Sequence, residues 1–156
     1  MVAFKPQKRP LLIQQVFSEL RLLYPDNARL RIQFCDPRHL QLETDEDYLK
    51  TILRNLTSNA IKAVHGRTDG MIEWRAWKED NHICLAVTDN GPGISPQVQP
   101  HIFEPFFTTK GVGEGTGLGL DTVQRIVKKH RGNIQVRSKP GDTRFQVRLP
   151  LAEGIV

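Results

Sequence analysis

The segment GEGTGLGLDTVQRIVKKH, residues 113–130, places four glycines at alternate positions directly before a stretch with helical apolar spacing. Glycine loses more backbone entropy on folding than other residues, so this run indicates a local need for bare backbone. Free N–H groups and the helix dipole at a helix N-terminus attract anions. The spacing differs from G-x-x-x-x-G-K-[ST] and from G-x-G-x-x-G. We interpret the segment as an anion-binding loop, with a merely flexible loop as the alternative.

Hydrophobic periodicity on either side of this segment predicts helices and paired strands. Helical spacing covers about 12–23, 46–65, with Asp45 as N-cap, and 118–131, ended by Gly132. Six alternating or apolar runs predict strands, and we expect a hairpin between the first two, across DPR. These runs are RLRIQFC, HLQLET, MIEWRAW, HICLAVTDN, NIQVRS and TRFQVRL. This order predicts helices packed on one face of a mixed, mostly antiparallel sheet, an α/β (α+β) two-layer sandwich.

Composition indicates one globular domain without a membrane segment. The 156 residues are 25% charged and 38% hydrophobic, and no apolar run reaches the length of a membrane span. We expect a lead-in over 1–9, without the apolar core of a secretory signal, and one domain over 10–156. Cys35 and Cys84 lie in predicted strands and are expected to be buried thiols. The net charge of +5 is compatible with nucleic acid, nucleotides or an acidic partner.

The predicted helix over 46–65 carries a polar stripe beside its apolar face. Asn55, Asn59 and Lys62 stand at i, i+4 and i+7 in TILRNLTSNAIKAV. Asparagine is a mediocre helix former, so two on one stripe call for a reason. A carboxamide oxygen suits Mg²⁺, and a lysine one turn further can reach a phosphate. A solvated helix face is the alternative.

The apolar strand that follows ends in a carboxylate and two glycines. VTDNGPGI, residues 87–94, places Asp89 at the strand end, followed by Gly91 and Gly93. A carboxylate on a pocket floor can accept a hydrogen bond from an exocyclic amine such as that of adenine. Glycines beside it would let a flat ring approach the backbone. An ordinary Asp-Asn-Gly turn is the alternative.

A long connection rich in glycine and proline, over about 91–117, leads to the opening segment. Its length predicts a functional or mobile loop. Within FEPFFTTKG, residues 103–111, we expect Phe103 and Phe106 to pin the loop to the core. The sharper hypothesis is a hinged lid over a nucleotide, with Thr108, Thr109 and Lys110 near the phosphates.

Together these motifs resemble the catalytic ATP-binding domain of two-component sensor histidine kinases, within the GHKL superfamily. NLTSNAIKAV resembles the N box, DNGPG the G1 box, FEPFF the F box and GTGLGL the G2 box, in the order of the family. GDTRFQVRLP is similar to its closing strand, so the resemblance covers residues 11–150. It implies the Bergerat fold, shared with DNA gyrase, mismatch-repair ATPases and heat-shock chaperones, with a glycine-rich ATP lid over about 91–117.

The resemblance also implies ligands and roles. Asn59 would coordinate Mg²⁺ and Asn55 would support the metal and the phosphates, with Asn59 and Lys62 as the catalytic pair. Asp89 would accept the adenine amine, assisted by Thr143 through its hydroxyl or a water molecule. The remaining residues expected to contact ATP are Gly91, Gly93, Ile94, Thr109, Lys110, Gly115, Thr116, Gly117, Leu118, Gly119 and Leu120.

Two departures from the family pattern matter. Ala63 stands where family members often carry an aromatic residue that stacks on adenine, so we expect stacking from elsewhere, with Ile94 as the candidate. The phosphoacceptor histidine of the family lies on a separate dimerising hairpin. None of the five histidines lies in such a segment, and His130 is interpreted as a core or near-core residue. We therefore expect the catalytic domain alone, monomeric by itself, from a homodimeric parent.

These observations leave three hypotheses. The first is a cytoplasmic, Mg-ATP-dependent protein-histidine kinase domain that phosphorylates a separate histidine domain and, indirectly, serves a response regulator receiver domain. A membrane anchor in the parent protein is left open. The second is a hydrolysing GHKL-type ATPase or a protein-serine kinase module, although no glutamate occurs between Arg54 and Val64 to activate water. The third, a nucleic-acid-binding module, is disfavoured because the basic residues are spread over outer faces.

Overall fold

The computed structural model describes residues 8–25, 29–34, 40–105, 107 and 119–151, without the side chains of residues 8, 9 and 34. No helix in these ranges is long and apolar enough to cross a membrane. The elements follow one another as β1 (Lys8–Leu12), α1 (Ile13–Arg21), β2 (Leu30–Phe34), β3 (Gln41–Asp45), α2 (Glu46–Val64), β4 (Ile72–Glu79), β5 (His82–Asp89), the 3-10 turn η3 (Gln99–His101), α3 (Gly119–Lys129), β6 (Asn133–Lys139) and β7 (Asp142–Pro150).

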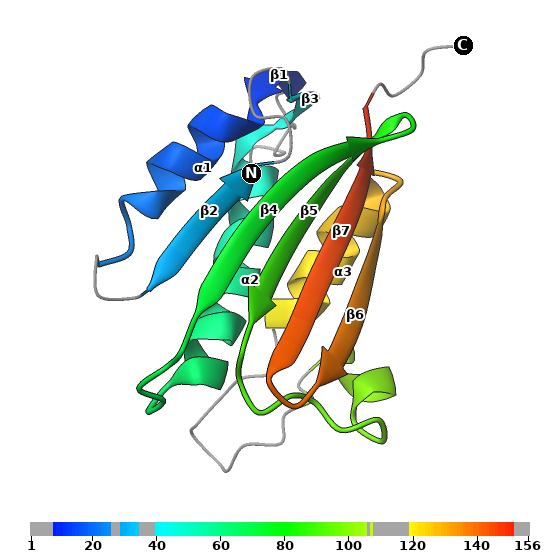
Figure 1. The fold of residues 1–156 in the computed structure, drawn as a ribbon. Helices are drawn as coiled ribbons and strands as arrows, with labels where there is room; N and C mark the ends of the chain where they lie inside the picture. Colours follow the sequence, from blue (N-terminus) through cyan, green and yellow to red (C-terminus); the bar gives the residue numbers. More distant parts are fainter. Residues whose placement is uncertain (1–7, 26–28, 35–39, 106, 108–118, 152–156) are drawn as a thin grey trace, which may run out of the picture.

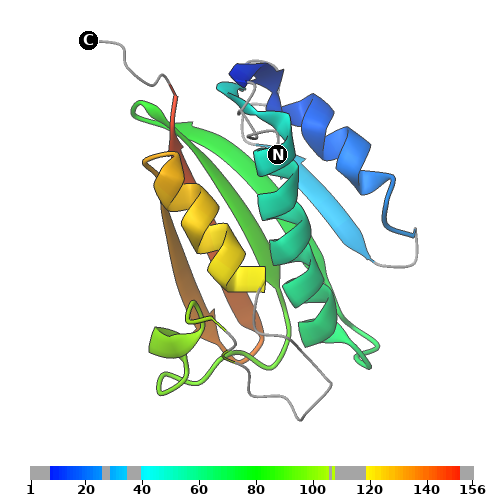
Figure 2. The ribbon, with the colours of Figure 1, turned by 180° about the vertical axis from the view of Figure 1, so that it is seen from behind.

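The main sheet has the order β2-β4-β5-β7-β6 in the part of the chain that the structure describes. Only β2 and β4 pair in parallel, and the other neighbours are antiparallel. Helices α1, α2 and α3 all lie on one face of this sheet, as the two opposite views show (Figures 1 and 2). The expected two-layer α/β sandwich with a mostly antiparallel sheet is therefore confirmed.

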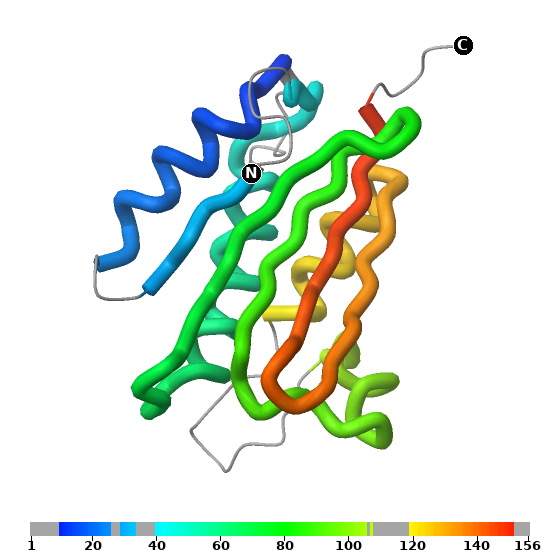
Figure 3. The backbone as a smooth tube through the Cα atoms, viewed as in Figure 1, coloured from blue at the N-terminus to red at the C-terminus, as the bar shows by residue number. Residues whose placement is uncertain are grey.

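The expected hairpin between the first two predicted strands is wrong. β2 pairs in parallel with β4, whereas β3 pairs with β1 in a separate antiparallel ribbon, from Lys8 opposite Asp45 to Leu12 opposite Gln41. The backbone trace shows this ribbon beside the N-terminal end of α1 (Figure 3). β1 was not predicted, and its first two residues lie in the expected lead-in. Alternation identifies a strand but carries no information about its partner, because pairing depends on distant residues.

Helix α2 packs its apolar face against the central strands. Leu49, Ile52, Leu53, Leu56 and Ala60 are all buried. The helix begins as expected at Asp45, whose carboxylate accepts a 2.9 Å hydrogen bond from the backbone N–H of Asp47. Strand β5 is buried from Ile83 to Val87 and is central in the sheet. This includes Cys84, confirmed as a buried thiol, while Cys35 lies outside the described residues.

The end of α3 differs from the expectation in one detail. The left-handed residue is Arg131, with φ of 61°, whereas Gly132 was expected to end the helix. The N–H of Gly132 bonds to the carbonyl of Val127 over 2.9 Å, the pattern of a Schellman motif. Gly132 is required for another reason, because a Cβ there would overlap the carbonyl oxygen of Arg148. His130 is half-buried and meets the Tyr48 ring edge-on at 4.7 Å, a near-core position as expected.

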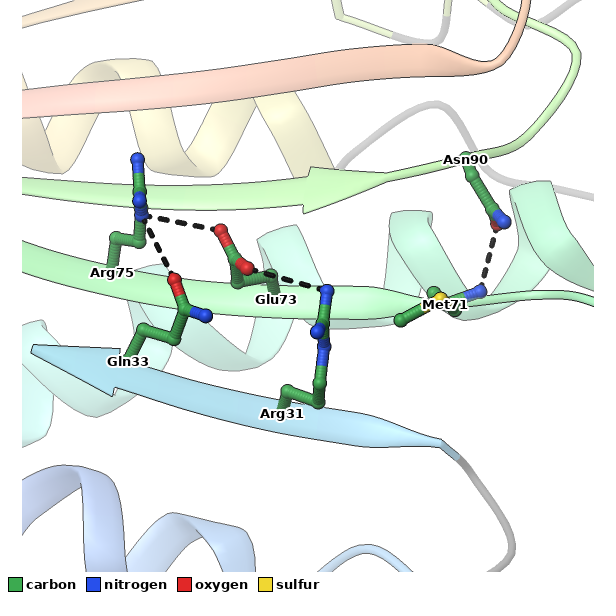
Figure 4. Close-up of polar contacts among 6 residues, drawn as sticks. All are labelled: Arg31, Gln33, Met71, Glu73, Arg75 and Asn90. Atoms are coloured by element: carbon green, nitrogen blue, oxygen red, sulfur yellow. Dashed lines mark hydrogen bonds and ion pairs between the residues drawn. The ribbon is translucent and has the colours of Figure 1, made fainter.

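The other face of the sheet carries none of the described helices, and several polar side chains lie on it (Figure 4). Glu73 pairs with Arg31 at 3.5 Å and with Arg75 at 3.2 Å, and Arg75 also donates to Gln33 over 3.3 Å. At the end of β5, the side-chain oxygen of Asn90 accepts a 2.7 Å hydrogen bond from the N–H of Met71.

Candidate active site

A cavity of about 370 Å³ lies between α2, the end of β5, the segment that follows it and the start of α3 and β7. It brings together residues from motifs that are far apart in the sequence. Four polar side chains line it: Asn59, Lys62, Asp89 and Thr143. Among the predicted site residues, Gly93, Ile94 and Leu120 also line it. This agreement supports a single site built from the N box, the G1 box and the start of the G2 helix.

Asp89 lies on the cavity floor and is only 5% exposed. Burial raises the pKa of its carboxyl group, and the nearby Asp142 raises it further. Against this, the 2.8 Å hydrogen bond from the N–H of Gly91 and the charge of Arg67 lower the pKa. Thr143 is the neighbour of Asp89 across the β5–β7 ladder and is buried as well. The cavity floor therefore presents a carboxylate beside a hydroxyl, a pair suited to recognising a polar ligand edge.

The two glycines that follow Asp89 are required by protein contacts. A Cβ on Gly91 would lie 2.8 Å from the carbonyl oxygen of Ala63 and 2.9 Å from Oδ1 of Asp89. Gly93 has φ of +89°, and a Cβ there would lie 2.8 Å from the carbonyl of Lys139. Both positions thus need glycine for packing against α2 and the β6–β7 turn, a reason that the sequence alone did not indicate.

The three residues of the polar stripe on α2, Asn55, Asn59 and Lys62, lie in two different environments. Asn59 and Lys62 line the cavity, and the buried Nδ2 of Asn59 has no hydrogen-bond partner among the described residues. Asn55 instead donates from Nδ2 to the carbonyl of Thr51 over 3.0 Å. Its Oδ1 lies near the start of α3, where a Cβ added to Gly119 would be 3.5 Å from this oxygen. Burying a polar group without a hydrogen bond costs free energy. The Nδ2 group of Asn59 is therefore suited to bind a ligand.

The apolar walls of the cavity were mostly missed by sequence reasoning. Beside Ala63, Ile94 and Leu120, they consist of Pro92, Val98, Ile102, Phe107 and Phe145. Phe145 occupies an inward position of the alternating strand β7, so the alternation indicated its burial but not the cavity it faces. Phe107 stacks on the ring of His101 at 5.6 Å. Position 63 itself is Ala63, and the apolar surface around it comes from several segments of the chain.

Comparison with known proteins identifies the family. The family model described as "Histidine kinase-, DNA gyrase B-, and HSP90-like ATPase" matches residues 44–153, which include the whole cavity lining. The chain belongs to this ATPase family. The catalytic domain of the histidine kinase ThkA, in a nucleotide-free crystal form, superposes with a TM-score of 0.82 at 26% identity, over 93% of this chain and 96% of that one. The GHKL-type fold expected from the four boxes is therefore confirmed.

Curated relatives of this ATPase-family domain are sensor kinases. The chain is 41% identical over 141 residues to "Signal transduction histidine-protein kinase AtoS" of Escherichia coli K12, covering 87% of this chain and 22% of AtoS. It is 31% identical over 163 residues to "Sensory histidine kinase/phosphatase NtrB" of Rhizobium meliloti, covering 94% of this chain and 42% of NtrB. The chain thus spans less than half the length of these relatives.

In this ATPase-family domain, the expected lid is described only in part. Phe103 packs against the core, edge-on to Phe145 at 6.5 Å, as expected for its anchoring role. Gly119 and Leu120 begin α3. The other lid residues of the prediction lie outside the described residues: Phe106, Thr108, Thr109, Lys110, Gly115, Thr116, Gly117 and Leu118.

Proposed function

We propose that this domain binds Mg-ATP and transfers the γ-phosphoryl group to a histidine on a separate dimerisation domain. The observation that carries the proposal is the buried Asp89–Thr143 pair on the floor of the cavity. The cavity wall also holds Asn59, whose buried Nδ2 has no hydrogen-bond partner among the described residues. The named kinases among the relatives support this reading. So does "Crystal structure of ShkA full-length in complex with AMPPNP", which superposes with a TM-score of 0.81 at 26% identity.

The base would be recognised at the cavity floor. Asp89 accepts a hydrogen bond from the adenine amine, and Thr143 assists from the neighbouring strand. Burial of Asp89 excludes competing water, which strengthens a hydrogen bond to its carboxylate. Ile94, Gly93 and the backbone beside Gly91 flank the ring, together with the apolar walls of the cavity.

The triphosphate would extend along α2 toward the start of α3. The residues present fit Mg²⁺, because the carboxamide oxygen of Asn59 is a hard ligand at the cavity wall. The Nδ2 of Asn59, which has no partner among the described residues, can donate to a phosphate oxygen. Bound Mg²⁺ would neutralise phosphate charge during transfer. Asn55 supports this region from the α3 side and Lys62 contacts phosphate. Further phosphate contacts are assigned to Thr109, Lys110, Gly115, Thr116, Gly117, Leu118, Gly119 and Leu120.

Phosphoryl transfer depends mainly on positioning and charge neutralisation, which this chain would supply. The nucleophilic histidine comes from the dimerisation domain of the same kinase, and the phosphoryl group then passes to a response regulator receiver domain in two-component signalling. We assign the domain to the cytoplasm, monomeric when isolated and part of a homodimeric parent. "Crystal structure of histidine kinase ThkA (TM1359) in complex with response regulator protein TrrA (TM1360)" shows such a partner for that kinase.

Calorimetric titration with a non-hydrolysable ATP analogue, with and without Mg²⁺, tests the proposal. We expect Asp89→Asn to weaken binding by roughly 10- to 100-fold, the loss for a hydrogen bond to a charged group. Asn59→Ala removes the Mg²⁺ dependence. The exposed Asn133 and Asp80 provide matched controls, Asn133→Ala and Asp80→Asn, which leave the affinity within about twofold. Unchanged affinity in either site variant would count against the assignment.

A second assay separates kinase from ATPase chemistry. The domain is incubated with labelled ATP and a histidine-bearing dimerisation hairpin from a relative. Acid-labile phosphate on the hairpin supports histidine transfer, acid-stable phosphate points to a protein-serine kinase, and free phosphate without transfer points to a hydrolysing GHKL-type ATPase.

A further inference from the structure

Ser138 connects two cavity-lining residues although it does not line the cavity itself. Its Oγ accepts a 2.7 Å hydrogen bond from the N–H of Ile94. The same Oγ lies 2.7 Å from Oγ1 of Thr143. Ser138 faces Thr143 across the β6–β7 ladder, and Thr143 faces Asp89 across the β5–β7 ladder. One row across the sheet therefore runs from Ser138 through Thr143 to the buried carboxylate.

The proton count favours one of the two directions that the Ser138–Thr143 hydrogen bond can take. A serine hydroxyl has one proton to donate and two lone pairs. Ile94 occupies one lone pair, and among the described residues Thr143 provides the only side-chain acceptor for the proton of Ser138. Accepting a hydrogen bond also polarises the hydroxyl and makes it a better donor. With Ser138 as donor, Thr143 keeps its own proton available for the cavity.

The surroundings of Ser138 hold this arrangement in place. The side-chain amide of Gln99 donates to the carbonyl of Ile94 over 2.8 Å and to the carbonyl of Ser138 over 3.4 Å. The N–H of Gly141 bonds to the carbonyl of Gly91 over 2.8 Å. The segment after β5 is thus bound to the β6–β7 hairpin on both sides of Ile94, so that Ser138 and Ile94 are oriented together.

We propose that Ser138 is a positioning residue for base recognition, which sets Thr143 as a hydrogen-bond donor beside the acceptor Asp89. This inference rests on the proposed ATP function. Adenine presents an amino donor next to the acceptor N1, which complements an acceptor–donor pair. Guanine presents an oxygen acceptor next to an N1–H donor, the reverse pattern. Ser138 therefore contributes to discrimination between the two purines through Thr143.

The test measures dissociation constants for Mg-ATP and Mg-GTP by calorimetry. We expect Ser138→Ala to weaken Mg-ATP binding roughly five- to tenfold, the loss of one neutral hydrogen bond, and to leave Mg-GTP within about twofold. Ser138→Thr retains the hydroxyl and restores the ATP preference. Ser95→Ala, at the exposed serine next to Ile94 in the segment after β5, leaves both dissociation constants unchanged. A merely structural role would lower both affinities together.

A double-mutant cycle tests whether Ser138 acts through Thr143. The pair Ser138→Ala/Thr143→Val binds Mg-ATP no more weakly than Thr143→Val alone, because both changes remove one function. Additive losses, or equal losses for ATP and GTP, overturn the proposal. If Ser138→Ala does not fold, Ser138→Cys replaces it, with a weaker donor and an intermediate ATP preference. A wild-type domain that binds neither nucleotide would instead refute the proposed function.

Discussion

The hydroxyl of Thr57 accepts a 3.0 Å hydrogen bond from Nε1 of Trp74, and both side chains are fully buried. This contact joins α2 to β4 inside the core. The Trp74 ring also meets Phe17 of α1 edge-on at 5.3 Å and Tyr24 at 5.9 Å. Thr57 also forms a hydrogen bond with Tyr24. These contacts help to set the rotation and height of α2 over the sheet, and with them the position of Asn59, two residues further along the helix.

Replacing Thr57 by valine removes its hydrogen bonds to Trp74 and Tyr24 while keeping the shape of the side chain. We expect Thr57→Val to lower the free energy of unfolding by about 1–3 kcal/mol, because the indole N–H is left buried without a partner. Urea denaturation measures the change. Thr68→Val, at an exposed threonine, is the control and is expected within about 0.5 kcal/mol of wild type. Equal stability of the two variants would contradict the role of Thr57.

The ionised side chain of Asp89 is expected to lower the stability of the folded domain, although it serves ligand binding. Burial raises its pKa in the folded state, so the folded protein binds protons more tightly than the unfolded chain, and stability falls as the pH rises through this range. At pH values above the raised pKa, the loss of stability has reached its full size. Asp89→Asn, which cannot ionise, should therefore unfold at higher temperature than wild type at pH 7. The difference should shrink as the pH falls below the raised pKa, in melting curves recorded from pH 7 to 4.

A stability difference between Asp89→Asn and wild type that does not change with pH would contradict this cause. Asp80→Asn is the matched control, because Asp80 is exposed and pairs with Arg148 far from the cavity. Its effect is expected to be small at every pH.

Gly93 and Gly141 form a natural comparison, since both have positive φ, of +89° and +86°. A Cβ on Gly141 would meet nothing within 4 Å, whereas one on Gly93 would press on the backbone of Lys139. Gly141→Ala is expected to cost about 1–2 kcal/mol, the strain of the left-handed conformation. Gly93→Ala adds a clash with the backbone of Lys139. It should therefore lower the free energy of unfolding by more than Gly141→Ala, and it should also weaken the binding of the ATP analogue. Chemical denaturation of both variants measures their stabilities. A larger loss for Gly141→Ala than for Gly93→Ala would contradict the close contact between Gly93 and Lys139.

The polar contacts of Figure 4 are expected to differ in strength. Asn90 bonds two backbone groups, the N–H of Met71 at 2.7 Å and the carbonyl of Asp69 at 2.6 Å. Asn90→Ala should therefore cost about 1–2 kcal/mol of unfolding free energy. Glu73→Gln keeps the shape and loses only surface ion pairs, so we expect less than about 1 kcal/mol. Salt titration of the melting temperature should affect wild type and Asn90→Ala alike, but Glu73→Gln less.

Local chemistry was sufficient to predict several elements and the residue types of the site. The span of α2 with its cap Asp45, the apolar strand β5 and the candidate residues Asn59 and Asp89 were all predicted from short windows of sequence. These features depend on periodicity, capping and motif spacing, which involve residues within a few positions of one another. The family resemblance added the expectation that these windows meet in one site.

Only the tertiary structure decided which distant residues touch. β3 pairs with β1 instead of β2, and Arg131 instead of Gly132 takes the left-handed conformation. The row from Asp89 through Thr143 to Ser138 joins residues about fifty positions apart. Such contacts are selected by the combined burial of a whole core, a sum over many weak and non-directional contributions that no local pattern encodes. The amino-acid order alone therefore specified the components of the cavity, and packing specified their arrangement.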